Sequence, residues 1–436
     1  MSEDYDINVR RGQRVGGAGA GTTLRGVRPG ACEGPLPITA SDHLHRVVVD
    51  GHTLVFDPVA HRAHLLNPSA VLVLDLLDGR PIDDVVTACA DAAGRAPGDV
   101  AAEVVAAVDV LVAEGLVATD PGSTDPGSTD VARGAPSSGR PPGANPIALT
   151  SDERVDLAGT HRTRRFRGIE TAFVIEADAA LVARLDELLV GLVDAPAGGG
   201  SLEGPSAFHR YVVAADGTTA TIALDGRRVT RLPQGPLVVQ HLLWHIDRLI
   251  TEEATHHLLL HAGAVVVDDG IVVLAGVMDS GKSTLTAALV QTGFAFVTDE
   301  IVAIDLDDRL VTPFARPITL EAGSWGLFPA ATAALAVDGD DAPRSSRRYL
   351  TPDGPLAGAR RGVTHVVFPE FVADSALTLE AVTPAQAALE LTQHTFTLDH
   401  RGLAAIADLV ERVPCVRLRH PGIEVAVPAL ASWLSS

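Results

Sequence analysis

Lysine is nearly absent from this chain. The 436 residues include 34 Lys and Arg side chains, and lysine occurs only at position 282. The two cations are not interchangeable, because an ammonium group is a compact point charge whereas a guanidinium is a broad planar fork. Since this sequence uses arginine wherever any cation would serve, Lys282 indicates a position that specifically needs an ammonium group.

Cysteines, aromatic residues and long apolar runs are also scarce. Cys32, Cys89 and Cys415 are too few and too far apart for a disulfide framework or a zinc knuckle. Aromatic residues make up 4% of the chain against 46% hydrophobic residues, so the cores are expected to be aliphatic. No apolar run reaches the roughly 18 to 20 residues of a membrane span, and the N-terminus lacks the apolar stretch of a signal peptide. These absences favour a soluble, cytoplasmic protein without a membrane partner.

Positive charge is outweighed by negative charge along the chain. The formal net charge is −21 at neutral pH. A surface that binds nucleic acid needs a stripe of basic side chains, so nucleic acid is not expected as a partner. The length is sufficient for two or three domains, each with its own core.

The chain divides by composition into four parts. Residues 1–40 are rich in Gly, Arg and Thr without periodicity, and they are predicted to form a disordered tail. Residues 120–149 contain the repeat PGSTD twice in tandem and are rich in Pro, Gly and Ser, which predicts a flexible linker. Two folded units remain, a small one at 41–119 and a larger α/β unit at 150–436.

In both folded units, turn and cap residues indicate where helices and strands begin and end. In the small unit, an Asp-Gly turn predicts a hairpin, and Asn67-Pro68 predicts a helix start, because Asn caps a helix and Pro fits its first turn. In the larger unit, strand-like and helix-like runs alternate. The expected elements are the hairpin His45–Val49 and His52–Phe56, a helix over Asp99–Glu114, the hairpin Val212–Ala215 and Thr221–Ala223, a helix over Pro236–Ile250, strands at 258–267, 271–275 and 294–298, and strands Thr364–Phe368 and Val416–Leu418 on either side of a helix near Pro384–Gln393.

The strand at 271–275 leads directly into a glycine-rich loop that a helix follows. The loop has the spacing G-x(4)-G-K-[ST] of a P-loop in its required setting, whereas a chance match in a glycine-rich chain would lack the flanking strand and helix. Its glycines let backbone N–H groups face phosphates, and its lysine reaches the β- and γ-phosphates. The loop therefore predicts an ATP site with a serine hydroxyl on Mg²⁺. The predicted nucleotide-binding residues are Gly276, Val277, Met278, Asp279, Ser280, Gly281, Lys282, Ser283 and Thr284.

Two adjacent carboxylates, Asp299 and Glu300, follow the apolar strand at 294–298. If this strand lies beside the P-loop strand in a parallel sheet, both carboxylates reach the edge where the phosphates bind. One carboxylate can then support Mg²⁺ while the other accepts a hydroxyl proton. The alternative is an ordinary acidic turn after a strand.

The block from His261 through Glu300 resembles the HPr kinase/phosphorylase superfamily, including related kinases from peptide-modifying gene clusters. The likeness is carried by a histidine ahead of the P-loop, His261, and by the acidic pair after the next strand. It implies a phosphoenolpyruvate-carboxykinase-like P-loop fold, Asp299 as general base, a catalytic setting for Lys282 and His261, and Glu300 with Ser283 near the metal. The family usually has Asp-Asp at the acidic pair and a glycine-rich signature after the P-loop, which this chain lacks. HPr is therefore not the expected substrate, and His261 is read either as a catalytic residue or as a buried, hydrogen-bonded histidine.

The small unit resembles a PqqD-like domain, the element that recognises leader segments of ribosomally made precursor peptides. The likeness is carried by the segments at 66–70, 76–79 and 114–117. It implies a winged-helix-like α+β fold to which a leader peptide adds a strand. A winged-helix DNA binder has a similar outline, but residues 83–114 hold seven acidic side chains and one basic one, which is the wrong sign for DNA.

Other polar clusters have simpler interpretations. His241 and His245, like His257 and His261, have the i, i+4 spacing that can bind zinc, but no Cys or acidic partner follows at metal-site spacing. The arginines of the segment 344–348 could reach a phosphate, and a solvated loop is the favoured interpretation.

Together these features predict an ATP- and Mg²⁺-dependent peptide kinase. The PqqD-like domain at 41–119 would capture a precursor peptide, and the P-loop domain would phosphorylate a Ser or Thr hydroxyl. Two alternatives stay open, namely a non-catalytic nucleotide-binding adaptor that delivers the peptide to another modifying enzyme, and a small-molecule kinase or ATPase. Relatives of the kinase domain often assemble, so a homo-oligomer is also left open.

Overall fold

The computed structural model describes residues 9–11, 39–118, 161–193, 207–328, 347–352 and 354–435. They form two compact units. One takes its residues from 1–134 and 381–415, and the other from 135–380 and 416–436. The predicted linker with its PGSTD repeat lies outside the described residues. The predicted mixed α/β class is confirmed.

The first unit is built on three antiparallel strands, β3 (His45–Val49), β4 (His52–Asp57) and β5 (Arg62–Leu66). The predicted hairpin is confirmed, and Asp50 and Gly51 adopt positive φ angles at its turn. Three helices follow, and Asn67 caps the first of them because its side chain accepts a hydrogen bond of 2.9 Å from the Ala70 N–H. The helices are α1 (Pro68–Leu76), α2 (Ile82–Ala93) and α3 (Pro97–Ala113).

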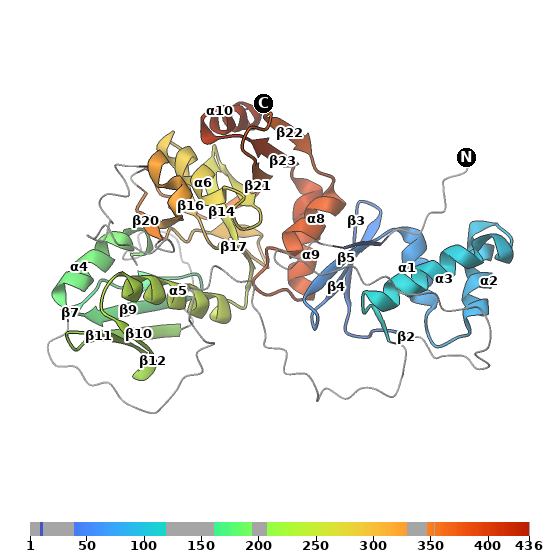
Figure 1. The fold of residues 1–436 in the computed structure, drawn as a ribbon, viewed down its shortest axis with the longest axis horizontal. Coiled ribbons are helices and arrows are strands. Elements are labelled where there is room, and N and C mark those ends of the chain that lie inside the picture. Colours follow the sequence, from blue (N-terminus) through green and yellow to red (C-terminus); the bar gives the residue numbers. More distant parts are fainter. Residues whose placement is uncertain are drawn as a thin grey trace. The chain divides into compact units, whose positions relative to one another are not determined.

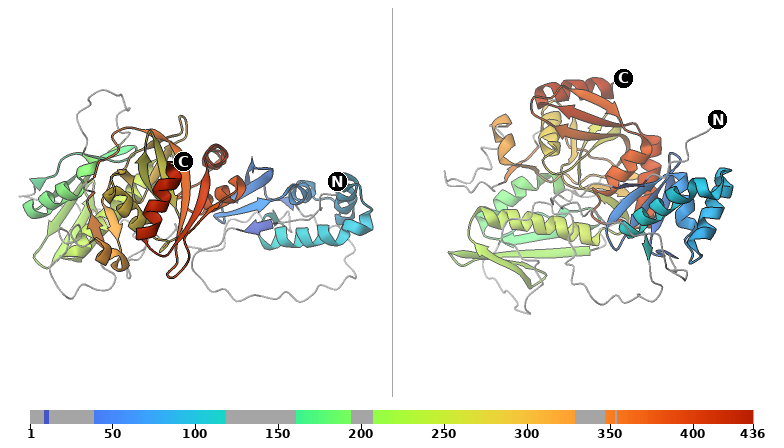
Figure 2. Two further views of the ribbon diagram at one scale, coloured as in Figure 1. Left: turned by 90° about the horizontal axis from the view of Figure 1, so that it is seen from above. Right: turned by 45° about the vertical axis from the view of Figure 1, so that its right-hand side comes forward.

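Both faces of this three-stranded sheet are covered by helices. Val55 and Leu66 pack with α1, α2 and α3 in one aliphatic core. Leu54 and Leu65, which are also buried, point to the opposite face because side chains alternate along a strand. That face is covered by α8 (Pro384–Thr392) and α9 (His400–Arg412), as Figures 1 and 2 show. The sequence placed the helix near Pro384–Gln393 in the larger unit, and its contacts group it with the first unit instead.

A short N-terminal strand pairs with the same sheet. Strand β1 (Val9–Arg11) runs antiparallel to β5, with Val9 opposite Leu66 and Arg11 opposite His64. The sequence predicted a disordered tail over residues 1–40, and for Val9–Arg11 this prediction is wrong, because the free backbone edge of β5 accepts a strand there. A second small pairing joins β2 (Thr39–Ala40) to β6 (Val117–Ala118).

The second unit contains two larger sheets. The first has the strand order β12-β11-β10-β9-β7, with β8 also on β9, and helices α4 and α5 pack against it (Figure 1). Helix α5 continues three residues beyond the predicted end at Ile250. The elements are β7 (His161–Arg162), β8 (Phe166–Arg167), β9 (Thr171–Ala177), α4 (Ala179–Leu188), β10 (Ala207–Ala215), β11 (Thr219–Leu224), β12 (Arg227–Pro233) and α5 (Pro236–Glu253).

The second sheet carries the predicted P-loop. Its order is β13-β17-β18-β21-β15-β14-β16, and β23 pairs with β21 and β22. Strand β14 is antiparallel to both β15 and β16, so the P-loop strand β15 and the strand before the two carboxylates run in the same direction without being neighbours. The elements are β13 (His257–Leu260), β14 (Ala262–Val267), β15 (Gly270–Ala275), α6 (Lys282–Gln291), β16 (Ala295–Thr298), β17 (Val302–Asp305), β18 (Leu310–Thr312), β19 (Ile318–Leu320), the 3₁₀ helix η2 (Ala322–Leu327), β20 (Arg348–Leu350), β21 (Arg361–Phe371), β22 (Thr378–Ala381), β23 (Cys415–His420) and α10 (Ile423–Leu434).

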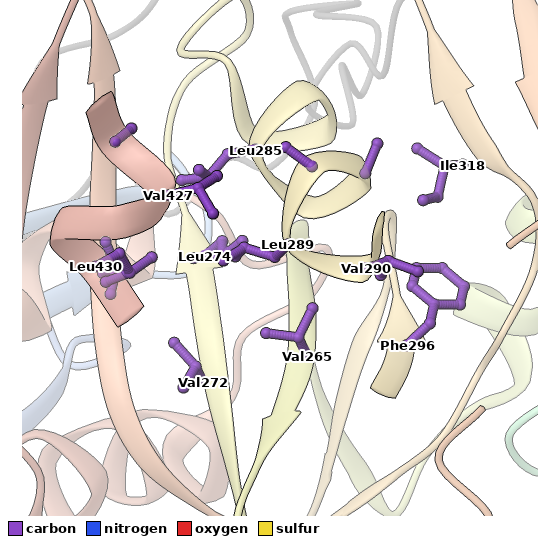
Figure 3. Close-up of a cluster of buried hydrophobic side chains, with 14 of the residues drawn as sticks. Val265, Val272, Leu274, Leu285, Leu289, Val290, Phe296, Ile318, Val427 and Leu430 are labelled. Atoms are coloured by element: carbon purple, nitrogen blue, oxygen red, sulfur yellow. The ribbon is translucent and has the colours of Figure 1, made fainter. Parts of the chain in front are cut away.

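An aliphatic core holds helix α6 against this sheet. Leu285 and Leu289 of α6 pack with Val265 and Leu274 from β14 and β15, and Leu430 from α10 joins the same cluster (Figure 3). All five side chains are fully buried. Because burying a leucine side chain contributes on the order of 2 kcal/mol, this cluster fixes the start of α6 relative to the sheet.

Candidate functional site

A cavity of about 550 Å³ lies in the second unit at the N-terminal end of α6. Most of its lining comes from the loop between β15 and α6, the end of β16, the segment that includes β19 and η2, and the corner where β21 and β23 end and α10 begins. His261, between β13 and β14, and Arg347, just before β20, complete the lining. Its walls therefore bring together residues that are far apart in the sequence.

The loop between β15 and α6 has the tight backbone that its glycines predict. A Cβ atom at Gly276 would come within 2.8 Å of the Ser280 Oγ, so a larger residue would displace the loop. Gly281 has a φ of +88° and caps α6, and Asp279 also has a positive φ. Gly281 is favoured there because L side chains rarely adopt this conformation.

Lys282 begins α6 and is 7% exposed. Its Nζ donates hydrogen bonds to the carbonyl oxygens of Gly276 at 2.7 Å and Val277 at 3.0 Å. Burial lowers the pKa of Lys282, and the nearby charges of Asp299 and Glu300 partly offset this effect. The ammonium group is thus held by the loop between β15 and α6, where it interacts electrostatically with Asp299 and Glu300.

The predicted nucleotide-binding residues divide into two groups. Six of them line the cavity, and the other three, Gly276, Val277 and Ser280, form the loop behind it. The lining residues are Met278, Asp279, Gly281, Lys282, Ser283 and Thr284.

Asp299 and Glu300 line the same cavity. The parallel direction of β15 and β16 brings them to it, although β14 separates these strands. The Oδ2 of Asp299 accepts a hydrogen bond of 3.1 Å from the Thr319 N–H, and the Oδ1 has no hydrogen-bond partner within the described part of the chain. Glu300 Oε1 lies 3.5 Å from the Nδ1 of His261, which sits between β13 and β14.

The two carboxylates differ in their ionisation. Burial and the neighbouring charge of Glu300 raise the pKa of Asp299 to about 7, and the Thr319 N–H only partly opposes this rise. Burial would also raise the pKa of Glu300, but the charges of His261 and Arg316 outweigh it, so the pKa of Glu300 is lowered. Burial lowers the pKa of His261. The site therefore pairs a carboxylate that stays ionised with one that can take up a proton near neutral pH.

Arg316 connects this site to helix α5. It is 5% exposed and forms an ion pair with Asp247 of α5. Its Nη2 donates a hydrogen bond of 2.7 Å to the Thr319 Oγ1, and the Thr319 backbone holds Asp299. Neither Arg316 nor Thr319 was among the site residues predicted from the sequence.

Several lining residues were not predicted as site residues. The arginine cluster at 344–348 was interpreted as a solvated loop, but Arg347 lines the cavity and lies 3.8 Å from Glu321. Arg348 covers the ring of Trp325 at 4.0 Å, and Arg344 lies outside the described residues. Phe371 and the segment 420–424 also line the cavity, and only the fold brings these distant segments to it.

The histidine pairs with zinc-like spacing have other partners. His245 is hydrogen bonded to the Tyr211 hydroxyl at 2.8 Å, and His257 to Glu170 at 2.7 Å. Over the described ranges, no three His, Cys, Asp or Glu side chains are grouped so that they could hold a metal ion. Within those ranges, none of the helices combines the length and apolarity needed to cross a bilayer.

The donor set fits a magnesium-bound phosphate chain. Mg²⁺ prefers oxygen ligands and usually takes one or two of them from the protein, with phosphates and water supplying the rest. The Ser283 hydroxyl and the Glu300 carboxylate open on one cavity, and the unpartnered Oδ1 of Asp299 lies beside this pair. The tight glycine loop provides the cradle in which phosphates approach the backbone.

Known proteins resemble parts of the chain. Residues 52–117 match the family described as "Coenzyme PQQ synthesis protein D (PqqD)", which confirms the PqqD-like domain predicted within 41–119. No curated protein matches the chain in sequence. Among solved structures, the Hpr(Ser) kinase/phosphatase from Coxiella burnetii is similar at 15% identity, over 41% of this chain and 87% of that chain, with a TM-score of 0.21.

Proposed function

We propose that this chain is an ATP-dependent kinase that binds a ribosomally made precursor peptide and phosphorylates one of its Ser or Thr hydroxyls. The observation that carries the proposal is the meeting of Lys282, Ser283, Asp299 and Glu300 around one cavity. A phosphate cradle alone would suit any nucleotide-binding protein. A buried carboxyl group with a raised pKa beside it supports proton transfer.

The reaction assigns a role to each side chain. The acceptor oxygen forms a bond to the γ-phosphorus of ATP, the bond between this phosphorus and the bridging oxygen breaks, and ADP leaves with the electron pair. Asp299 takes the proton of the acceptor hydroxyl, and Lys282 with the loop N–H groups neutralises the phosphate charge. When bound at Ser283 and Glu300, Mg²⁺ would supply further charge neutralisation. His261 lies beside Glu300, where it can orient this carboxylate.

The PqqD-like domain supports a peptide as the acceptor. Its sheet has helices on both faces, so an extended peptide can add to it only at an edge. Strand β5 accepts β1 at such an edge. A domain that holds the leader segment raises the local concentration of the acceptor hydroxyl, by the same physics as any tethered ligand.

The test is to incubate the full chain with Mg·ATP and the precursor peptide encoded beside its gene, and to weigh the peptide. We expect the mass of one added phosphate, which Asp299→Asn abolishes. Asp307→Asn is the matched control, because Asp307 is exposed and lies outside the cavity. Peptide binding without a mass change would refute the kinase and favour the adaptor, and ATP hydrolysis that the peptide does not affect would favour a small-molecule kinase or ATPase.

A further inference from the structure

One wall of the cavity is chemically different from the rest. It is formed by Phe371 at the end of β21, His420 at the end of β23, and the residues Pro421 to Glu424 that lead into α10. We call these residues the Phe371–His420 wall. Helix α10, which starts in this wall, packs against α6 (Figure 1).

Backbone hydrogen bonds fasten this wall to the phosphate loop. The Phe371 N–H donates to the Ser280 carbonyl oxygen at 3.2 Å, and the Val372 N–H donates to the His420 carbonyl oxygen at 3.0 Å. A Cβ atom at Gly281 would lie 3.4 Å from the Phe371 Cβ and 3.9 Å from the His420 Nε2. The wall therefore stands directly beside the turn that begins α6.

The side chains of the wall combine an open aromatic face with an unused hydrogen-bonding group. Phe371 is 49% exposed although it belongs to a cavity, and its ring centroid lies 5.9 Å from that of His420. His420 is 1% exposed, and neither of its ring nitrogens has a hydrogen-bond partner among the residues that the structure describes. Burial lowers the pKa of His420, so the neutral ring offers one donor and one acceptor.

The opposite wall has a different character. Apart from Leu327, its lining side chains are polar or charged, namely Thr319, Glu321, Ser324 and Arg347. The nearby Trp325 does not line the cavity: it packs against the aliphatic core, Arg348 lies over its ring at 4.0 Å, and its indole N–H donates to the Leu320 carbonyl oxygen. Of the two walls, only the Phe371–His420 wall offers an aromatic face within the described cavity lining.

We propose that the Phe371–His420 wall binds the nucleobase of the nucleotide. The base packs on the Phe371 ring and places its polar edge toward His420, while the triphosphate follows the loop to Lys282. The polar wall with Arg347 is then left for the acceptor. This assignment rests on the nucleotide-binding part of the proposed function and does not depend on the acceptor's being a peptide.

The experiment compares two ligands that share the phosphates and differ in the base. Binding of Mg·ATP and of Mg·tripolyphosphate to the full chain is measured by calorimetry, for the unchanged protein and for Phe371→Ala. Because stacking of a base on an aromatic ring is worth about 1–3 kcal/mol, we expect ATP affinity to fall by roughly tenfold or more, and tripolyphosphate affinity to stay the same. Phe371→Trp should keep ATP binding, which separates loss of the aromatic face from loss of folding.

Phe208→Ala is the matched control, since Phe208 is a similarly exposed phenylalanine, at 53%, that lies on β10 outside the cavity. It should leave ATP affinity unchanged. Equal weakening of both ligands by Phe371→Ala, or no weakening of ATP, would overturn the nucleobase assignment while the nucleotide site stands. If the unchanged protein binds neither ligand, both the assignment and the proposed kinase fail.

Discussion

At Lys282 the side chain is held by two carbonyl oxygens at hydrogen-bond distance, in a loop with little free space. A planar guanidinium cannot reproduce a point charge in this setting. We expect Lys282→Arg to weaken Mg·ATP binding by roughly tenfold to a hundredfold, as the loss of a charged hydrogen bond does. Calorimetry measures this loss. Arg227→Lys is the control, because it exchanges the same two side chains at an exposed position on β12, and full activity in Lys282→Arg would remove the role assigned to the loop.

His245 gives a prediction about pH. Burial lowers the pKa of its imidazole to about 4, against an unfolded value near 6.5. Because the unfolded chain binds the proton more tightly, the stability contributed by neutral His245 is complete above about pH 6.5 and is lost as the pH falls toward 4. The loss amounts to about 2 kcal/mol by pH 5 and about 3 kcal/mol by pH 4. His245→Gln removes the titration, so its thermal midpoint should fall less than that of the unchanged protein between neutral pH and about pH 5, and parallel curves would refute the prediction.

At the scale of elements, Arg316 links α5 to the proposed base. The link runs from Asp247 through Arg316 to Thr319, whose backbone N–H holds Asp299. Small displacements of reacting groups are costly, so we expect Arg316→Met to lower kcat by on the order of tenfold to a hundredfold. The affinity for Mg·ATP should stay within about twofold, because the phosphate loop is untouched.

Thr319→Val supplies the matched control for this link. It removes the Oγ1 that Arg316 binds and keeps the backbone N–H that holds Asp299. If Arg316 acts through Thr319, the kcat of the double variant Arg316→Met/Thr319→Val should be little lower than that of Arg316→Met alone. Additive losses in kcat, or a parallel loss of ATP affinity, would show that Arg316 acts by another route.

Strand β1 leads to a prediction about peptide binding. It occupies the edge of β5, while α9 contacts β3 at the other side of the sheet. Because β1 belongs to the same chain, its local concentration at the edge of β5 is high. A peptide that binds at this edge must therefore displace β1. Removing residues 1–12 should tighten peptide binding by about three- to tenfold, measured by fluorescence anisotropy with a labelled peptide. Weaker binding after the truncation would instead make Val9–Arg11 part of the peptide site.

The structure of consecutive residues around the cavity could be predicted from the sequence, whereas the order of the strands in the sheet could not. The strand, loop and helix around Lys282 were predictable because they are consecutive in the sequence, and each has a local cause. The position of Asp299 was predicted on the assumption that its strand lies beside β15, and β14 lies there instead. Phe371 and His420 left no local signal, because the sheet order alone brings them to the cavity, and Arg347 was assigned to a solvated loop although it lines the cavity.

At the scale of the whole molecule, chain connectivity constrains how the two units can be separated. Residues 381–415, which contain α8 and α9, belong to the first unit, but they connect β22 and β23, which pair with each other in the second unit. The PqqD-like domain is therefore joined to the P-loop unit by more than the predicted linker at 120–149. A simple deletion of the domain would leave α8 and α9 without the sheet that covers them.

This connectivity predicts the behaviour of a fragment that starts at residue 161. The buried apolar side chains of α9, among them Leu403, Ile406 and Val410, lie in a helix that packs on β3. Without β3 to β5 their cover is incomplete, and exposed apolar surface binds hydrophobic dyes. We expect the fragment to bind anilinonaphthalene sulfonate more strongly than the full chain does, while mixing it with separately produced residues 1–134 lowers the dye signal. A fragment with no extra dye binding and unchanged thermal stability would show that α8 and α9 are supported by the second unit alone.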